Sequence, residues 1–183
     1  MKNNQQTYLM TQSPKTTSPY EQIINRLDLQ PHPEGGFYKE VYRSKGVIQG
    51  DSLGAKFQGE RNYSTSIYFL LTSEVFSSFH RIVQDEIWHF YDGSPLALHI
   101  ISPEGDYSQR IIGRAIAQGE VPQFVVPGGS WFGAMVIRET DFSLLGCTVA
   151  PGFDFRDFEL ATRSDLLLKF PLHSEIIRKL TRG

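Results

Sequence analysis

Residues 64–101 read STSIYFLLTSEVFSSFHRIVQDEIWHFYDGSPLALHII, and this stretch decides the fold class of the chain. It holds four runs rich in β-branched and aromatic residues, separated by short segments that contain Ser, Asp, Gly and Pro. The runs are 64–71, 76–82, 86–91 and 96–101. No helical period lies between them. Consecutive short strands joined by turns are typical of an antiparallel sandwich or a closed barrel, so the chain is expected to be all-β.

The same strand pattern continues on both sides of this stretch. Further strands are predicted at 37–43, 107–112, 123–126, 131–137 and 143–149. A short helix is expected over 19–28, because Ser18 and Glu21 can form a capping box and Pro19 suits the first helical turn. Apolar residues beyond position 165 recur with helical spacing, which predicts two short C-terminal helices broken at Pro171 and packed on the outside of the barrel.

Length and composition restrict the class of protein. The 183 residues, 40% of them hydrophobic, fit a single domain over 18–183, while the polar segment 1–17 is expected to be a disordered tail. A net charge of -2 leaves no basic surplus for binding nucleic acid. We find no signal-peptide core and no apolar run long enough to span a membrane, and expect a cytoplasmic protein. Cys147, the single cysteine, is interpreted as a buried structural thiol.

Three stretches carry a family resemblance. They are HPEGGFYKEVYRS (32–44), the block 64–101 and VPQFVVPGGSWFGAMV (121–136). Together they resemble a small family of largely uncharacterised bacterial and fungal cupins, known as cupin family five. The resemblance covers roughly residues 20–160 and implies a double-stranded β-helix, or jelly-roll, barrel that commonly forms a homodimer. It implies little about the reaction, because the fold hosts many functions.

Metal-dependent cupins share a motif that supplies three His and one Glu as metal ligands. In this chain Glu86 keeps its spacing to Gly93, and Pro127 keeps its spacing to Gly129. The first two His positions fall on Arg81 and Phe79, or on Ile82 and His80 if a shorter spacing applies, and the third falls on Phe132. An apolar ring cannot coordinate an ion, so we expect no metal and no cofactor. A metal-dependent oxygenase or isomerase is kept as an alternative.

Strand alternation indicates which side chains share one face of a strand, and the cupin resemblance implies that the face with Glu86 points into the barrel. Glu86, Trp88 and Phe90 lie on one face of their strand, whereas His89 lies on the other. The proposed catalytic residues are His80 and Glu86. The expected ligand-binding residues are Trp88, Phe90, Phe132, Ser78 and Arg61, the last through its guanidinium group. Such a set resembles an apolar small-molecule pocket with a few convergent polar groups.

The leading functional hypothesis is a small-molecule-binding cupin with metal-independent isomerase or epimerase activity on a carbohydrate-like or carbonyl-containing ligand. A neutral histidine can act as a base and a buried glutamate as an acid, which resembles the deoxysugar epimerases of this fold. The tyrosine donor of those enzymes has four candidates here: Tyr38, Tyr63, Tyr68 and Tyr91.

Each assignment has a structural alternative. His80 could be a hydrogen-bonded barrel residue, and the three aromatic residues could simply fill the barrel. His32 and Glu34 precede Gly35 and Gly36, where a tight turn is the simpler interpretation and a place at the pocket edge the second one. A non-catalytic binding or sensing module therefore remains an alternative function.

Overall fold

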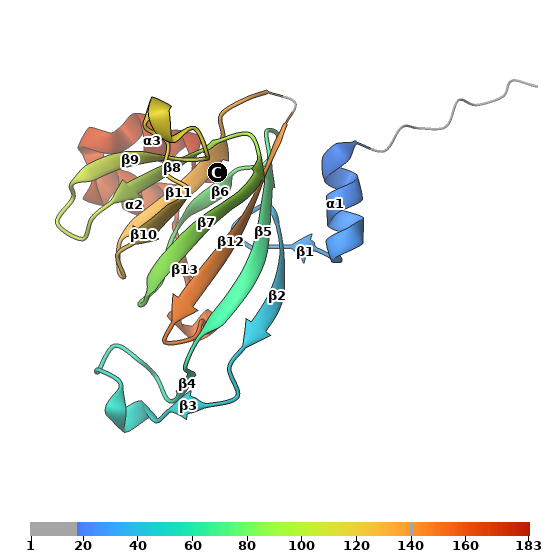
Figure 1. The fold of residues 1–183 in the computed structure, drawn as a ribbon. Coiled ribbons are helices and arrows are strands. Elements are labelled where there is room, and N and C mark those ends of the chain that lie inside the picture. Colours follow the sequence, from blue (N-terminus) through green and yellow to red (C-terminus); the bar gives the residue numbers. More distant parts are fainter. Residues whose placement is uncertain (1–17, 140) are drawn as a thin grey trace, which may run out of the picture.

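The computed structural model describes residues 18–139 and 141–183. The disordered tail expected over 1–17 lies outside the described residues. Two antiparallel sheets face each other and form the barrel (Figure 1). No helix among the described residues combines the length and the apolar character needed to cross a membrane.

The larger sheet has six strands. In spatial order they are β1 (Gln30–Pro31), β2 (Phe37–Arg43), β5 (Thr65–Thr72), β12 (Phe142–Ala150), β7 (Asp85–Gly93) and β10 (Gln123–Val126). The five strands of the second sheet are β13 (Glu159–Leu160), β6 (Ser77–Arg81), β11 (Trp131–Val136), β8 (Leu96–Ile101) and β9 (Tyr107–Ile112). A separate pair joins β3 (Val47–Ile48) to β4 (Arg61–Asn62). The fold is the expected double-stranded β-helix of the cupins.

The nine strands predicted from the sequence are all present, most with ends shifted by one or two residues. The four strands that the sequence did not predict are each two residues long, namely β1, β3, β4 and β13. Two residues are too few to show an alternation of apolar and polar side chains. These strands exist because a neighbouring strand offers them hydrogen bonds.

The main core lies between the two sheets. Large side chains from both sheets meet there, among them Phe69, Trp88 and Phe132, each about 1% exposed. Leu98 and Leu145 are completely buried beside them. The interior around these side chains is therefore closely packed.

A second apolar layer covers the outside of the five-stranded sheet. It is made by α2 (Arg163–Lys169) and α3 (Ser174–Lys179), which are separated by a short 3-10 turn that begins at Pro171. Their buried residues Leu166 and Ile177 pack against Phe79 and Trp131, which point outward from β6 and β11. The predicted pair of C-terminal helices, its break and its position are confirmed.

The N-terminal helix α1 (Pro19–Leu27) begins with the predicted capping box. The Ser18 hydroxyl accepts from the backbone of Glu21, whose carboxylate accepts from the backbone of Ser18. The helix ends one residue earlier than predicted, because Asp28 adopts a left-handed conformation with φ of 53°. None of its residues is buried, and it stands away from the barrel (Figure 1).

Candidate functional site

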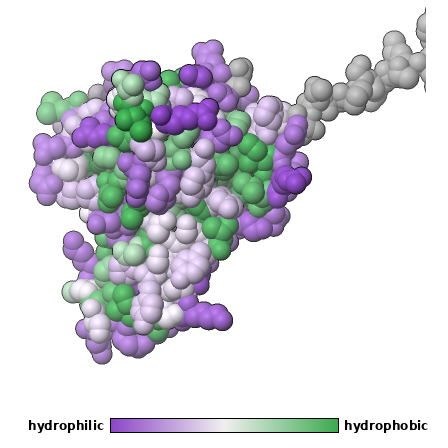
Figure 2. Space-filling view, viewed as in Figure 1, coloured by the Kyte–Doolittle hydropathy of each residue, from purple (hydrophilic) through white to green (hydrophobic). Residues whose placement is uncertain are grey.

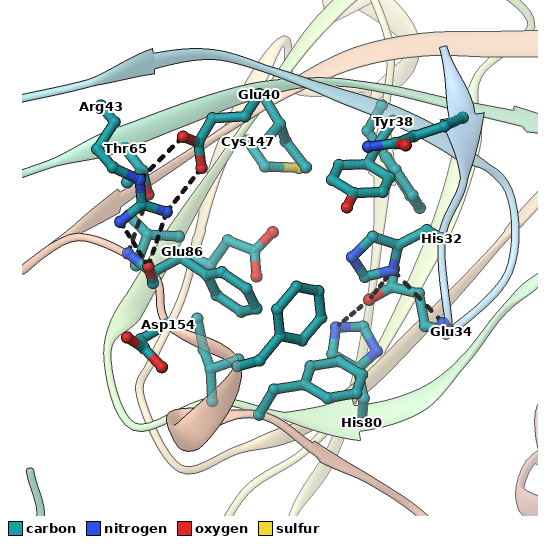
Figure 3. Close-up of a pocket in the computed structure, with 18 residues that line it drawn as sticks. His32, Glu34, Tyr38, Glu40, Arg43, Thr65, His80, Glu86, Cys147 and Asp154 are labelled. Carbon is teal, nitrogen blue, oxygen red and sulfur yellow. Dashed lines mark hydrogen bonds and ion pairs between the residues drawn. The ribbon is translucent and has the colours of Figure 1, made fainter. Parts of the chain in front are cut away.

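A cavity of about 340 Å³ opens at one end of the barrel. Its walls come from strands β2, β5, β6, β7 and β12, the segment 30–34 and the segment 153–158 (Figure 3). Polar and ionisable side chains converge on it from several of these elements. They are His32, Glu34, Tyr38, Glu40, Arg43, Thr65, His80, Glu86, Cys147 and Asp154. The two residues proposed as catalytic, His80 and Glu86, both line this cavity.

The register of β6 determines how His80 reaches the cavity. His80 and Ile82 point inward and line it, whereas Phe79 packs under the C-terminal helices. Arg81 also points outward and pairs with Glu159. Of the two spacings left open by the motif, the shorter one therefore describes the inward residues of this strand.

Glu34 lies at the centre of a buried cluster. Its Oε2 is 3.1 Å from Nε2 of His80 and 3.3 Å from Nδ1 of His32, and its Oε1 accepts a hydrogen bond of 2.7 Å from Ser77. The cluster joins two distant parts of the chain, since His32 and Glu34 precede β2 whereas Ser77 and His80 belong to β6.

The turn after Glu34 depends on glycine. Gly35 has φ of +118°, and a Cβ there would lie 2.2 Å from the carbonyl oxygen of Phe76. Gly36 has φ of +72°, and a Cβ there would lie 2.6 Å from a methyl group of Leu71. Only glycine allows this close approach and this conformation, so the pair permits the chain to lie against β6 with Glu34 directed inward.

Backbone hydrogen bonds fix the tautomer of each imidazole in the cluster. Nδ1 of His80 lies 2.8 Å from the carbonyl oxygen of Ser78, which can only accept, so Nδ1 carries the proton and Nε2 of the neutral ring does not. Nδ1 of His32 accepts from the backbone N–H of Glu34, which leaves the proton of the neutral ring on Nε2. Both nitrogens directed at Oε2 of Glu34 are therefore acceptors. A hydrogen bond between Oε2 and either nitrogen requires a proton.

That proton resides on Glu34. Burial, followed by the nearby charge of Glu86, raises the pKa of Glu34 well above its ordinary value. Burial lowers the pKa of His80 to about 3 and that of His32 to about 4. The short contacts have the geometry of ion pairs, but burial disfavours the charged form of every partner. The cluster is a neutral carboxyl group that donates to an unprotonated imidazole nitrogen.

Glu86 enters the same cavity from β7. Burial raises the pKa of its carboxyl group to about 7, and a hydrogen bond from the thiol of Cys147 lowers it by a smaller amount. The thiol itself is buried, and its pKa is raised well above the ordinary value, so Cys147 stays protonated. Glu86 therefore exchanges a proton near neutral pH while Cys147 does not.

Tyr38 is the one candidate tyrosine of the four that lines the cavity. Its ring meets His32 edge-on with centroids 4.6 Å apart, and its hydroxyl points into the open space (Figure 3). Tyr63 is exposed, and Tyr68 and Tyr91 contact each other from outward-facing positions. His89 also lies outside the lining, where it contacts Thr148.

Two ion pairs flank the outer part of the cavity. Arg43 binds both carboxylate oxygens of Glu40, at 2.9 and 2.7 Å. Asp154 binds Arg156 at 2.9 and 2.7 Å, and this side-chain hydrogen bond holds the pKa of Asp154 well below its usual range. Beside Asp154 three phenylalanines form an apolar wall. They are Phe153, Phe155 and Phe158.

The other expected site residues lie behind the lining. Trp88 and Phe132 are buried in the core, and Phe90 packs against the same core. Phe132 supports the cavity indirectly, since its ring lies 4.1 Å from that of His80, centroid to centroid. The apolar wall of the cavity is made instead by the segment 153–158, which follows β12.

Ser78 and Arg61 differ from the expectation in a similar way. A bulge in β6 opposite β11 shifts the alternation, so the hydroxyl of Ser77 reaches Glu34 and that of Ser78 has no hydrogen-bond partner. Arg61 is buried and forms an ion pair with Asp157, with Nε 2.7 Å from Oδ2. It thus holds the segment 153–158 and does not line the cavity.

His32, Glu34 and Tyr38 are the residues that sequence reasoning placed second or left open. The signal was present in the string HPEGGFY, where two ionisable residues precede a Gly pair and a strand. The simpler interpretation as a turn was correct for the glycines. It was incomplete for Glu34, because the turn brings its carboxyl group to His80.

The residues at the metal-ligand positions of the cupin fold do not fit a metal ion. Ile82 and Phe132 occupy two of the histidine positions, and His80 directs Nδ1 at a carbonyl oxygen and Nε2 at Glu34. Within 18–139 and 141–183, no three His, Cys, Asp or Glu side chains are arranged to hold an ion.

Known proteins share the sequence pattern and the architecture of this chain. The protein SO0799 from Shewanella oneidensis is 41% identical, with a TM-score of 0.81 over 89% of this chain and 97% of that one. The uncharacterized protein YML079W of Saccharomyces cerevisiae is 31% identical over 170 residues, which cover 88% of this chain and 84% of that protein.

A more distant likeness concerns the fold alone. Oxalate decarboxylase from Bacillus subtilis superposes with a TM-score of 0.51 at 13% identity, over 84% of this chain and 37% of that one. The family described as Cupin superfamily (DUF985) matches residues 21–161, which is most of the chain. This chain therefore belongs to that family of cupins.

Proposed function

We propose that this cupin binds a small carbonyl compound and moves a proton at the carbon next to the carbonyl group, as an isomerase or epimerase does, without a metal ion. One observation supports the proposal most directly. The carboxyl group of Glu86 lies across the cavity from His32, which belongs to the neutral cluster centred on Glu34 (Figure 3).

Glu86 is the base in this proposal. Its pKa of about 7 matches the value at which proton transfer is efficient near neutral pH. As the C–H bond of the ligand breaks, the proton passes to the Glu86 carboxylate and the electron pair moves to the carbonyl oxygen, which forms an enolate. Burial keeps water from competing for this charge.

His32 and Tyr38 supply the acid. The neutral His32 ring carries its proton on Nε2, which faces the cavity, and can donate it to the developing oxyanion (Figure 3). Nδ1 can then recover a proton from Oε2 of Glu34, 3.3 Å away. The hydroxyl of Tyr38 lies beside the same ring. Return of a proton to the same carbon from the other face gives an epimer, and return to the adjacent carbon gives an isomer.

His80 takes a positioning role in this scheme. Both of its ring nitrogens already have partners, so His80 acts by orienting the Glu34 carboxyl group rather than by contacting the ligand. The sequence suggested a histidine base and a glutamate acid. The tautomer of His32 reverses that order, because its cavity-facing Nε2 already carries the proton and has no free lone pair with which to act as a base.

The test is exchange of ligand hydrogen with solvent deuterium. The metal-depleted protein, with its metal content measured by elemental analysis, is incubated in deuterium oxide near pH 7 with a panel of neutral aldoses and ketoses. We expect deuterium at the carbon next to the carbonyl group of at least one compound. Glu86→Gln should lower the exchange rate by about 100-fold or more, since it removes the base but keeps the shape.

His89→Gln is the matched control, because His89 lies on the same strand but on its outward face. Its exchange rate should stay close to that of the unmodified chain. Exchange that survives Glu86→Gln, exchange that requires an added divalent ion, or no exchange with any compound of the panel would each overturn the proposal. Binding without exchange would instead indicate a sensing module.

A further inference from the structure

The charges around the cavity restrict the class of ligand, and this inference rests on the proposed function. We propose that the ligand is an electrically neutral hydroxy-carbonyl compound, such as a free aldose or ketose, and that the cavity rejects its phosphorylated and carboxylated forms. The carrying observation is that the cationic side chain of the lining, Arg43, has no donor left for an anion.

Arg43 offers five N–H groups, and each has an acceptor within the protein. Nε and Nη2 bind the two carboxylate oxygens of Glu40. Nη1 binds the side-chain oxygen of Asn62 at 2.8 Å, and both Nη atoms lie 3.2 Å from the carbonyl oxygen of Phe153. A phosphate or carboxylate normally binds arginine through two parallel hydrogen bonds. Here Glu40 already occupies that position.

Two further carboxyl groups of the described lining, those of Glu86 and Asp154, also disfavour an anion. Glu86 of β7 has no cationic partner among the described lining residues. Asp154 adds a second carboxylate near the opening, although Arg156 compensates for its charge. An anionic ligand would meet repulsion from Glu86 in a partly desolvated space, where charges interact more strongly than in water.

The remaining contacts suit a neutral polar molecule. Tyr38 and Nε2 of His32 offer uncharged hydrogen-bonding groups, and Glu86 offers an acceptor. Phe153, Phe155 and Phe158 provide ring faces and edges for the C–H groups of such a molecule. Phe155 is 52% exposed, so the wall extends to the opening of the cavity. A hydroxyl-rich ring or chain with apolar C–H faces matches both kinds of surface.

The test compares ligands that share a skeleton and differ in charge. Equilibrium binding to the intact protein is measured near pH 7 by saturation-transfer NMR for neutral aldoses and ketoses, their phosphate esters and their uronates. We expect at least one neutral compound to bind about 30-fold or more tightly than its own phosphate ester and uronate. Glu40→Gln should reduce this ratio by about tenfold, because it releases Arg43 for an anion.

Asp28→Asn is the matched control. Asp28 also pairs with a cation of β2, Lys39, but outside the cavity, so the ratio should not change. A phosphate ester or uronate that binds as tightly as its neutral form, an unchanged ratio in Glu40→Gln, or no neutral binder would overturn the inference. Deuterium exchange on a phosphorylated or carboxylated compound would support the proposed function and refute this inference. Tighter binding of neutral compounds without any deuterium exchange would support this inference and refute the proposed function.

Discussion

Two buried carboxyl groups, those of Glu34 and Glu86, line the candidate site. Glu34 and Glu86 are each less than 10% exposed, and burial raises the pKa of both. Glu34 lies within 3.3 Å of two imidazole nitrogens, whereas Glu86 has a hydrogen bond from the thiol of Cys147. Few hydrogen bonds offset the burial of Glu86, so ionisation of its carboxyl group lowers the free energy of unfolding.

Replacement of Glu86 by Gln tests how much the ionisation of this carboxyl group destabilises the folded chain. The folded chain holds the Glu86 proton more tightly than the unfolded chain, with a pKa of about 7 against the model-compound value of 4.5. Ionisation therefore costs stability, and the cost grows as pH rises from about 5 to about 7 and stays constant above that. We expect the unmodified chain to lose up to about 3 kcal/mol relative to Glu86→Gln between about pH 5 and pH 8.

Urea denaturation at both pH values measures the difference. The lowered pKa values of His32 and His80 destabilise the chain as pH falls, but they act in both proteins and cancel in the comparison. Glu74→Gln, at an exposed turn, serves as the control and should follow the unmodified chain. Parallel stability profiles for Glu86→Gln and the unmodified chain would show that the Glu86 carboxyl group is not perturbed.

At the scale of elements, the segment 153–158 is the part of the site with the least regular structure. It contains a single 3-10 turn, Phe155–Asp157, and carries the three phenylalanines of the wall. Asp157 anchors it. Both carboxylate oxygens bind Arg61 of β4, and Oδ2 also accepts from Gln84 at 2.6 Å. The position of the wall therefore depends on a buried ion pair with side chains only 1% and 2% exposed.

Removal of one partner from this pair should be costly. Arg61→Met would leave the Asp157 carboxylate buried without its cation, and we expect a loss of about 3–5 kcal/mol in the free energy of unfolding. Ligand binding should weaken as well, because the phenylalanine wall loses its anchor. Denaturant titration and the NMR binding experiment measure the two effects separately.

Two further variants distinguish loss of the buried Arg61–Asp157 ion pair from loss of an exposed ion pair. Arg81→Met breaks a pair whose side chains are 37% and 54% exposed, so it should cost less than about 1 kcal/mol. The double change Arg61→Met with Asp157→Leu removes both buried charges and should recover much of the stability lost in the single variant. A small loss for Arg61→Met alone would contradict the anchoring role.

At the scale of the whole molecule, apolar surface remains at the edge of the six-stranded sheet. Beyond Tyr38 the outer edge of β2 has no partner strand within 18–139 and 141–183, because β1 pairs only with Phe37 and Tyr38. Val41 and Tyr42 are 46% and 54% exposed there. The helix α1 stands beside the barrel with no buried residue, and Figure 2 shows apolar side chains gathered next to it. A free strand edge with apolar residues is suited to pairing with another chain.

We predict that the protein is a homodimer in which β2 contributes to the interface. Sedimentation velocity at micromolar concentration should give the mass of two chains, and Val41→Lys should shift the equilibrium toward the monomer. Leu172→Lys is the control, because Leu172 is 93% exposed in the turn between the C-terminal helices and should leave the dimer intact. A monomeric unmodified chain would refute the prediction.

The sequence by itself determined the local features of this protein. The capping box at Ser18 and the nine longer strands follow from signals contained within a few consecutive residues, whereas the inward direction of Glu86 came from the family resemblance. The family match adds the way in which these strands are connected. The apolar and polar alternation of β7 also placed His89 on the outside, where it contacts Thr148.

Only the tertiary structure decided how the site is assembled. The contact of Glu34 with His80, the exchange of Ser77 for Ser78 at the bulge, and the phenylalanine wall held through Arg61 all join segments far apart in the chain. No local pattern encodes such contacts, because they depend on strand register and on how closely two glycines let the backbone approach. Burial then sets the protonation of Glu34 and Glu86, since a carboxyl group loses its charge only where the folded chain removes water.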